Sequence, residues 1–336
     1  MTDITESAPG PRARGGSASL RGAGLMALGI AAVLAAGFGL DGDPFLLNLA
    51  GYTCGFALFA LSVNVMLGGL GEVPLGHCMF YGLGAYAPAM TMHHLGLPYE
   101  AGVVIGMVVA AALAAPIGWL TLHLTGAYFS IVSWGLSGVA MVTALNLDVT
   151  GGPLGLFGFS RLAVGPFDLS QPATYFFVAA AVLLAVLALL YHIRSSRFGR
   201  AMEAIRQGPH LARSLGIDVF RERLKALVLS APIAALAGAL SLPYTQIVTP
   251  EVMSVLRTVD ALLAALIGGV GLIFGPAVGA VIFTILPQFL DLDPNVKVLV
   301  FSLLIILVMV AAPGGLHQLW KAAAARLTHA RKGDAS

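Results

Sequence analysis

Residues 174–193 are TYFFVAAAVLLAVLALLYHI, an apolar run without Asp, Glu, Lys or Arg. A helix needs about 20 such residues to cross the hydrocarbon core of a bilayer. The rest of the chain has the same character, since 58% of its 336 residues are hydrophobic and only 10% are charged. An average soluble domain has roughly 25% charged residues. The composition excludes an ordinary soluble globular protein and predicts an all-α, polytopic membrane protein.

Basic residues follow this run directly and form the largest of three clusters. The clusters lie near the N-terminus, between residues 194 and 225, and near the C-terminus, and only Arg161, Arg257 and Lys297 lie elsewhere. Because the cytoplasmic loops of membrane proteins carry an excess of Lys and Arg, all three clusters are predicted to be cytoplasmic. The formal net charge is only +2, so the chain lacks the basic surplus of nucleic-acid binders.

The number of membrane crossings must agree with this charge pattern, because two cytoplasmic points are separated by an even number of spans. After the central cluster come the span 225–248, a glycine-broken region 257–290 that counts as two passes, and the span 296–313. These four crossings return the C-terminus to the cytoplasm, and the total is about ten transmembrane or broken helices. The spans expected before the cluster are 23–40, 45–66, 74–95, 101–122, 126–146 and 174–193.

The same pattern divides the chain into a disordered cytoplasmic tail at 1–22, a transmembrane domain at 23–313 and a cytoplasmic tail at 314–336. A cleaved signal peptide is the alternative for the first span. Its apolar core of about 18 residues is longer than a typical signal core, and no convincing cleavage site follows, which favours retention.

Two pentapeptides share three glycines in register. Residues 67–71 are LGGLG and residues 267–271 are IGGVG, and each is followed by a proline, Pro74 or Pro276. Transporters built from internal repeats use interrupted helices of this kind to offer backbone groups to a solute. The match predicts breaks near both clusters and a possible internal inverted repeat, with two ordinary glycine turns as the alternative. The candidate translocation path comprises Asn64, Gly68, Gly69, Gly71, Ser130, Ser133, Gly268, Gly269 and Gly271, with Thr143 as a further polar side chain.

Catalytic and metal-binding patterns are missing from the sequence. It has no His-Glu-x-x-His pair, no Gly-x-Ser-x-Gly elbow and no phosphate-binding loop, so we expect no catalytic residues, no metal and no cofactor in this chain. Cys54 and Cys78 both lie in apolar segments, which excludes a disulfide framework. Glu72 and Asp260 lie close to span ends, where simple solvation at the interface accounts for their charges, and this scarcity of intramembrane acid disfavours ion coupling.

The central basic segment, residues 194–224, is predicted to fold as a short two-helix elbow. Ala201, Ala204 and Ile205 recur at helical spacing with arginines on the other side, Gly208-Pro209 interrupts the pattern, and Gly216 suits a helix C-terminus. A cytoplasmic loop needs only its positive charge to fix the membrane topology, so a loop that is also folded suggests a further role. We therefore expect another protein to dock on it. The candidate docking residues are Arg197, Arg200, Ala204, Arg206, Ala212, Leu215 and Gly216.

Residues 196–206, SRFGRAMEAIR, followed by Leu215-Gly216-Ile217, resemble the cytoplasmic signature of branched-chain amino acid ABC transporter permeases, particularly LivM-type subunits. Residues 61–68, 75–77, 126–132, 150–156 and 268–276 agree with the same family, so the resemblance runs from about residue 45 to 312. One departure concerns the Glu-Ala-Ala-x-x-x-Gly site of the wider superfamily, which residues 210–216 match only at Ala212 and Gly216.

The resemblance implies a permease subunit of an importer in the bacterial inner membrane. A second permease subunit would complete the path, two cytoplasmic ATPases would hydrolyse ATP and move the elbow, and an external solute-binding protein would deliver the solute. Branched-chain amino acids are the expected solute, with urea or short amides as the alternative. A secondary carrier working alone and an intramembrane enzyme are the competing classes.

Overall fold

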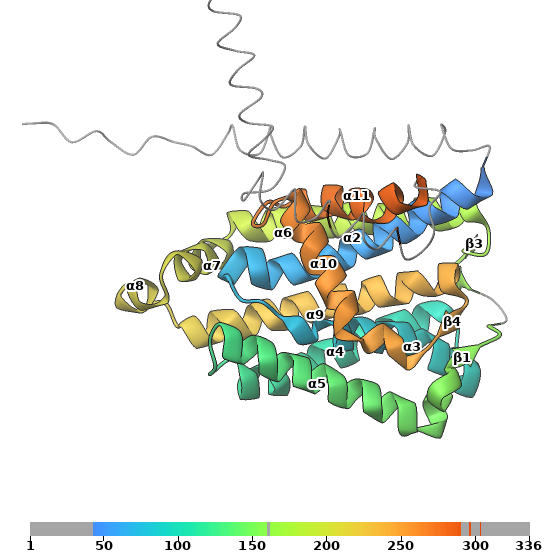
Figure 1. Cartoon of the computed structure of the whole chain (residues 1–336), viewed down its shortest axis with the longest axis horizontal. Coiled ribbons are helices and arrows are strands. Elements are labelled where there is room, and N and C mark those ends of the chain that lie inside the picture. The colour runs from blue at the N-terminus through green and yellow to red at the C-terminus, as the bar shows by residue number, and fades with distance from the viewer. Residues whose placement is uncertain (1–42, 160–161, 290–295, 297–302, 304–336) are drawn as a thin grey trace, which may run out of the picture.

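The computed structural model of the chain describes residues 43–159, 162–289, 296 and 303. These residues form a bundle of long helices, with short helices at one end and short strands at the other (Figure 1). We call the end that carries α7 and α8 the elbow end, and the end that carries the strands the loop end. The expected spans 23–40 and 296–313 and both expected tails lie outside the described residues, apart from positions 296 and 303.

Five described helices are long and apolar enough to cross a membrane, which confirms a polytopic helical fold. They are α2 (Pro44–Leu70), α4 (Tyr99–Thr121), α5 (Ala127–Asn146), α6 (Pro172–Ser195) and α9 (Val219–Thr245). The most apolar stretches of α2 and α9 are 83% and 78% buried, against 22–28% for α4, α5 and α6. Two helices therefore form the centre of the bundle, and the other three present most of their surface outward.

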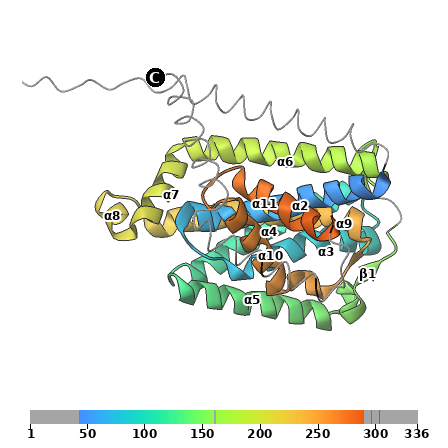
Figure 2. The same cartoon turned by 45° about the horizontal axis from the view of Figure 1, so that its top comes forward.

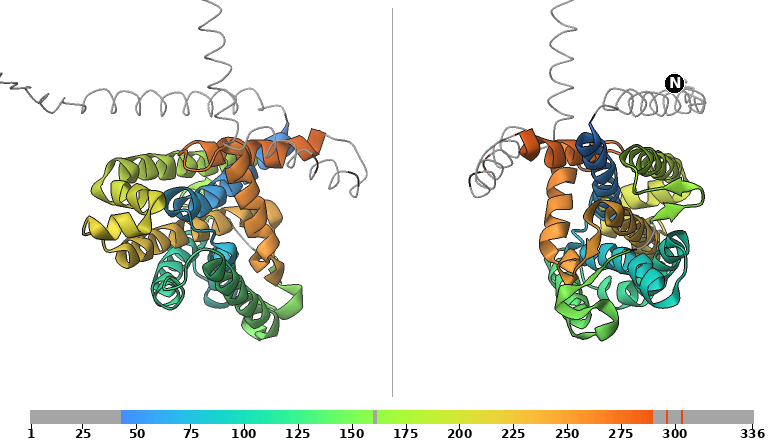
Figure 3. Two further views of the ribbon diagram at one scale, coloured as in Figure 1. Left: turned by 60° about the vertical axis from the view of Figure 1, so that its left-hand side comes forward. Right: turned by 90° about the vertical axis from the view of Figure 1, so that its right-hand side faces the viewer.

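The central helices α2 and α9 run in opposite directions. Tyr52, near the start of α2, stacks on Tyr244, near the end of α9, with ring centroids 4.7 Å apart. Small residues allow neighbouring backbones to approach, and Gly84 on α3 (Cys78–Leu95) lies directly against the Ala235 carbonyl of α9. Viewed along the bundle, α2 lies between α6 on one side and α10 on the other (Figure 3).

The first re-entrant segment, residues 71–77, follows the end of α2 at Leu70. The chain turns at Gly71 and returns toward the middle of α2, where the ring of His77 stacks near that of Phe59, with centroids 6.3 Å apart. It includes the 3₁₀ turn η1 (Leu75–His77), and α3 begins only at Cys78. The expectation of a continuous helical span over 74–95 is therefore wrong for residues 74–77, where Pro74 precedes a non-helical crossing.

The second re-entrant segment, residues 246–254, follows α9 at the loop end. It contains the strand β4 (Ile247–Val248) and the 3₁₀ turn η4 (Pro250–Met253), and it leads to α10 (Val255–Gly268). The starts of α3 and α10 meet inside the bundle, because the Cys78 amide donates to Thr258 Oγ1 at 2.9 Å and the Cys78 thiol donates to the Met253 carbonyl at 3.0 Å.

The order of long helix, re-entrant segment, 3₁₀ turn and second helix thus occurs twice in opposite directions, once for α2 with α3 and once for α9 with α10. This arrangement agrees with an inverted repeat. The two glycine pentapeptides do not mark its equivalent positions, because one lies at the end of α2 and the other at the end of α10, and both lie at the elbow end.

The expected two passes in 257–290 are α10 and α11 (Gly275–Phe289), separated by a break at residues 269–274. The second of these helices runs beside α2 toward the loop end (Figure 2), where Phe283 stacks on Phe56 at 5.4 Å and Thr284 hydrogen-bonds Thr53 at 2.8 Å. The region therefore contains two helices, as expected, of 14 and 15 residues, and their count as two membrane passes stays a prediction.

Short elements cover the loop end between α5 and α6. They are η2 (Asp148–Thr150), η3 (Gly152–Leu154), β1 (Leu156–Phe157), β2 (Ala163–Val164) and β3 (Phe167–Asp168). Strand β1 pairs antiparallel with β4, and β2 pairs with β3. The first pairing holds this loop against the second re-entrant segment.

Candidate functional site

The elbow consists of α7 (Arg197–Gln207) and α8 (Pro209–Ser214), which follow α6 at the elbow end, with α8 furthest from the centre of the bundle (Figure 1). Ser196 caps α7, since its hydroxyl accepts a hydrogen bond from the Gly199 amide at 3.3 Å. The buried face of α7 carries Met202 and Ile205, and Met202 reaches Gly69 on α2. The predicted two-helix elbow is present, although its buried face contains Met202 rather than Ala201 or Ala204, which are only half-buried.

The tip of the elbow carries two exposed leucines. Leu211 and Leu215 are 66% and 70% exposed, whereas Ala212 between them is buried against the bundle. Gly216 follows α8 in a left-handed conformation, as expected for a residue after a helix C-terminus. Of the predicted docking residues, Leu215 and Gly216 are therefore exposed at the tip, while Ala212 supports the elbow from within.

Two arginines of α7, Arg197 and Arg200, lie on its outer side. Arg197 and Arg200 are exposed, and Arg200 donates to the Ser195 carbonyl at 2.9 Å. Ala204 is half-buried. These three predicted docking residues remain predictions, and the structure places two of them on the open surface of the elbow.

The two glycine pentapeptides lie against each other at the elbow end. Asn64, which is 8% exposed, bonds the broken segment between α10 and α11 twice. Its side-chain amide donates to the Leu272 carbonyl at 3.0 Å, and its side-chain oxygen accepts from the Gly271 amide at 3.2 Å. A Cβ atom on Gly68 would lie only 2.7 Å from the Gly271 nitrogen, so this contact requires glycine.

Two arginines bind the glycine pentapeptides 67–71 and 267–271, which we call the glycine segments, and a third binds the residue that follows the first of them. Arg206 of α7 donates to the Gly68 carbonyl at 2.9 Å. Arg194, near the end of α6, donates to the Gly271 carbonyl. Arg223, near the start of α9, forms an ion pair with Glu72 and donates to the Leu122 carbonyl at 3.1 Å.

Glu72 is thus not solvated at a span end as expected. It is 12% exposed and its partner Arg223 is 4% exposed. Its second carboxylate oxygen accepts from the Gly126 amide at 3.3 Å. Asp260 is half-buried on α10. The sequence alone did not assign a partner to Glu72, because Arg223 lies 151 residues further along the chain.

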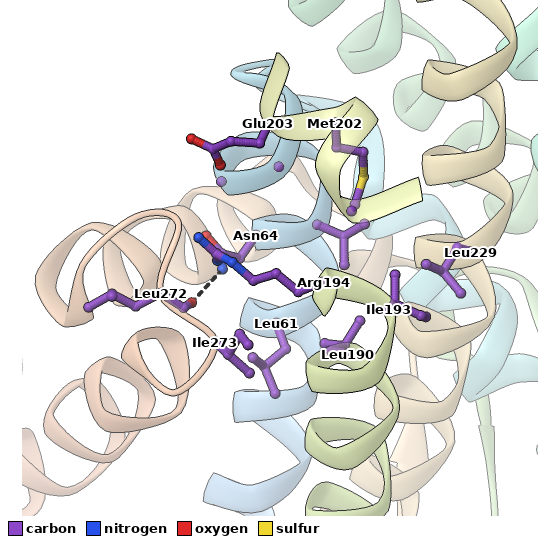
Figure 4. Close-up of a pocket in the computed structure, with 14 residues that line it drawn as sticks. Leu61, Asn64, Leu190, Ile193, Arg194, Met202, Glu203, Leu229, Leu272 and Ile273 are labelled. Carbon is purple, nitrogen blue, oxygen red and sulfur yellow. Dashed lines mark hydrogen bonds between the residues drawn. The ribbon is translucent and has the colours of Figure 1, made fainter. Parts of the chain in front are cut away.

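A hollow opens beside these contacts, between α2, α6, α7 and α9 (Figure 4). Its empty volume, together with the solvent at its mouth, is about 550 Å³. Its wall is mostly apolar, and Figure 4 shows Asn64 and Arg194 directed toward the segment that carries Leu272. The lining residues include Leu61, Leu190, Ile193, Met202, Leu229 and Ile273, with Glu203 at the rim.

Ser130 and Ser133, the predicted path residues on α5, bond the first re-entrant segment. Ser130 donates to the Val73 carbonyl at 2.8 Å, and Ser133 accepts from the Gly76 amide at 3.2 Å. Both serines are buried. The further candidate Thr143 is exposed and donates to a carbonyl of its own helix. The structure thus assigns the two serines a role in holding residues 73–76, and a contact with solute stays a prediction.

The remaining path candidates are glycines of the two breaks. Gly69 faces Met202 of α7, Gly71 ends α2, and Gly268 lies against the Gly275 carbonyl at the start of α11. Gly269 and Gly271 both have positive φ angles within the break. The structure therefore brings Asn64 and all the predicted glycines together at the elbow end, and separates them from Ser133 by the re-entrant segment.

Arg257 is a charged residue whose role the sequence did not indicate. It lies on α10, donates to the Tyr52 hydroxyl at 2.8 Å and lies over the ring of Tyr81, 5.7 Å from its centroid. Aromatic rings stabilise a guanidinium group in this position. Within the described ranges, no group of three or more His, Cys, Asp and Glu side chains is arranged to hold a metal ion.

Broken helices that meet inside a membrane bundle, as the starts of α3 and α10 do, are typical of transport proteins built from repeats, and the fold and the site together define a protein of that class. The chain belongs to the family described as the permease component of the branched-chain amino acid transport system, which matches residues 45–310. The resemblance found in the sequence is therefore confirmed.

Curated relatives agree with this membership. The chain is 31% identical over 293 residues to the high-affinity branched-chain amino acid transport system permease protein LivM of Escherichia coli (strain K12), covering 80% of this chain and 69% of the relative. It is 26% identical over 287 residues to LivH of the same strain, covering 78% and 90%. A probable LivM of Methanocaldococcus jannaschii is 26% identical over 230 residues, covering 63% and 65%. No solved structure matches the chain.

Proposed function

We propose that this chain is a permease subunit of an ATP-driven importer and that it moves branched-chain amino acids across the bacterial inner membrane by alternating access. The observation that carries this proposal is the set of hydrogen bonds between the elbow and the glycine segments. An element that protrudes from the bundle and is bonded to broken helices is suited to transmit a movement from a partner outside the membrane to the path inside it.

The proposal includes three kinds of partner. Two ATPase subunits bind and hydrolyse ATP, so this chain needs no cofactor of its own. One ATPase docks on the elbow, where Leu211 and Leu215 offer exposed apolar side chains amid basic residues. A second permease subunit of the same family completes the path, and an external binding protein delivers the solute. The proposed topology has both termini in the cytoplasm, on the side of the elbow.

The substrate class rests on the names of the relatives, which are branched-chain amino acid permeases. A permease of this family for urea or short amides is the alternative. Competition of labelled leucine uptake by valine, isoleucine, urea and acetamide distinguishes the two, because only aliphatic amino acids compete at low concentration if the proposal is correct.

Reconstitution into liposomes tests the transport mechanism. We expect leucine uptake only when the ATPases, the second permease subunit, the binding protein and ATP are all present. Uptake by the purified chain alone, driven by a solute or ion gradient, would contradict the proposal and favour a secondary carrier.

Docking on the elbow has its own test. Replacing both Leu211 and Leu215 with alanine removes apolar surface worth roughly 1–2 kcal/mol per leucine when it is buried by a partner. We expect the affinity for the ATPase to fall about 30-fold or more. Leu120→Ala is the matched control, since Leu120 is a similarly exposed leucine on α4. Equal affinities of the double variant and the control for the ATPase would show that the elbow tip is not part of the docking surface.

A further inference from the structure

The carbonyl oxygens at the end of α2 are unequally satisfied by the helix itself. The Leu67 carbonyl accepts from the Gly71 amide at 3.0 Å, and the Met66 carbonyl accepts from the Glu72 amide at 3.3 Å. The Gly68 carbonyl lies beyond these bonds and receives its hydrogen bond from Arg206 of α7. A helix C-terminus is favoured by a cation that bonds its last carbonyls. Arg206 therefore caps α2 from the elbow.

Arg206 lies between the two glycine segments. Its Cγ would be 3.8 Å from a Cβ atom on Gly71, and its guanidinium group abuts Gly271. Arg194, on the other side of the junction between α6 and α7, bonds the Gly271 carbonyl. One arginine thus bonds the end of α2 and the other bonds the segment after α10.

The attachment of α7 to the bundle has an apolar part that involves neither arginine. It consists of the buried side chains of Met202 and Ile205, which belong to the main apolar core. Both arginines are exposed, and the carbonyl oxygens that accept their hydrogen bonds belong to glycines, Gly271 and Gly68. Their geometry suits a connection between a moving element and a backbone break better than a role in packing.

We propose that Arg194 and Arg206 are positioning residues that couple the elbow to the two glycine segments. When the elbow moves, Arg206 shifts or releases the end of α2, and Arg194 does the same for the break between α10 and α11. The contact of Asn64 with Gly271 and Leu272 then opens or closes with the elbow. This inference rests on the proposed function, since it concerns how ATP hydrolysis by the partners reaches the path.

The test compares Arg206→Met with Arg206→Lys in the complete transporter, reconstituted with its ATPases, second permease subunit and binding protein. Methionine keeps an apolar stem beside Gly71 but donates no hydrogen bond, whereas lysine keeps the charge and a donor. Leucine uptake and ATP hydrolysis are measured on the same liposomes. For Arg206→Met we expect the amount of leucine taken up per ATP hydrolysed to fall about tenfold or more, because one charge-assisted hydrogen bond is lost. The rate of ATP hydrolysis should stay near normal.

Arg206→Lys should restore most of the ratio, and Arg194→Met should lower it as Arg206→Met does. Lys225→Ala is the control, because Lys225 is exposed and its partner among the described residues is Glu222 on its own helix. An unchanged ratio in both methionine variants overturns the inference. So does an equal fall of uptake and hydrolysis, since the bond would then stabilise the fold without coupling. If the unmodified complex shows no ATP-dependent uptake, the proposed function fails and this inference fails with it. If it shows such uptake and the ratio stays constant, only the inference fails.

Discussion

The ion pair between Glu72 and Arg223 gives a stability prediction whose size follows from burial. Arg223 is 4% exposed and Glu72 is 12% exposed. Arg223→Ala leaves the Glu72 carboxylate with the Gly126 amide as a hydrogen-bond partner. Removing one member of a buried pair costs about 3–5 kcal/mol. Because Glu72 keeps one bond and some exposure, we expect the free energy of unfolding to fall by about 3 kcal/mol, the lower end of that range.

The assay is a titration of the purified chain with SDS in mixed micelles, followed by circular dichroism. Lys225→Ala is the control on the same helix, since its pair with Glu222 is 61% exposed on the lysine side and should cost about 0.5 kcal/mol or less. The double variant Glu72→Gln with Arg223→Met removes both charges. Its loss in free energy of unfolding should be smaller, by roughly 1–3 kcal/mol, than the sum of the losses for Glu72→Gln alone and Arg223→Met alone. Additive losses, or a loss for Arg223→Ala no larger than the control's, would refute this account of the pair.

Two further predictions concern helix contacts. Gly84→Val should prevent stable purification in detergent, because the valine side chain would overlap a backbone carbonyl of α9. Gly135→Ala is the control and should leave the yield and melting temperature unchanged, because no described atom lies within 4 Å of the added methyl group. Similar yields for the two variants would show that α3 and α9 can separate. Ser133→Ala removes the partner of the buried Gly76 amide and should lower the free energy of unfolding by about 1–3 kcal/mol in the same SDS titration. Thr143→Ala, which removes an exposed hydroxyl, should be close to neutral, and equal effects of the two changes would contradict the role of Ser133.

The helical spans could be predicted from the sequence because each is a long apolar run between polar turns. The elbow could be predicted for a related reason, since the change from apolar to amphipathic and basic at Arg194 is abrupt. The break near Gly268 followed from its glycines. In each case the information lies in neighbouring residues, within one helix or one turn.

A break after α2 was expected from the first glycine pentapeptide, but the re-entrant course of the two segments could not be predicted in the same way. Only contacts from distant helices make a backbone that is not α-helical tolerable at residues 71–77. The partners of Glu72 and Asn64 are also distant in sequence, at Arg223 and at 271–272. Their identification required the packing of α2 against α9 and against the break before α11.

The first re-entrant segment also constrains how the protein is made. Its backbone groups are bonded by Ser130 and Ser133 of α5, and α3 begins with a hydrogen bond from Cys78 to Thr258, 180 residues later in the chain. None of these partners exists when residues 71–77 leave the ribosome, and irregular backbone is not tolerated in contact with lipid. We therefore expect the segment to reach its final position only after α5 and α10 have been synthesised. Although α2 is among the first helices of the described residues to be made, we expect the segment that follows it to be among the last to be completed.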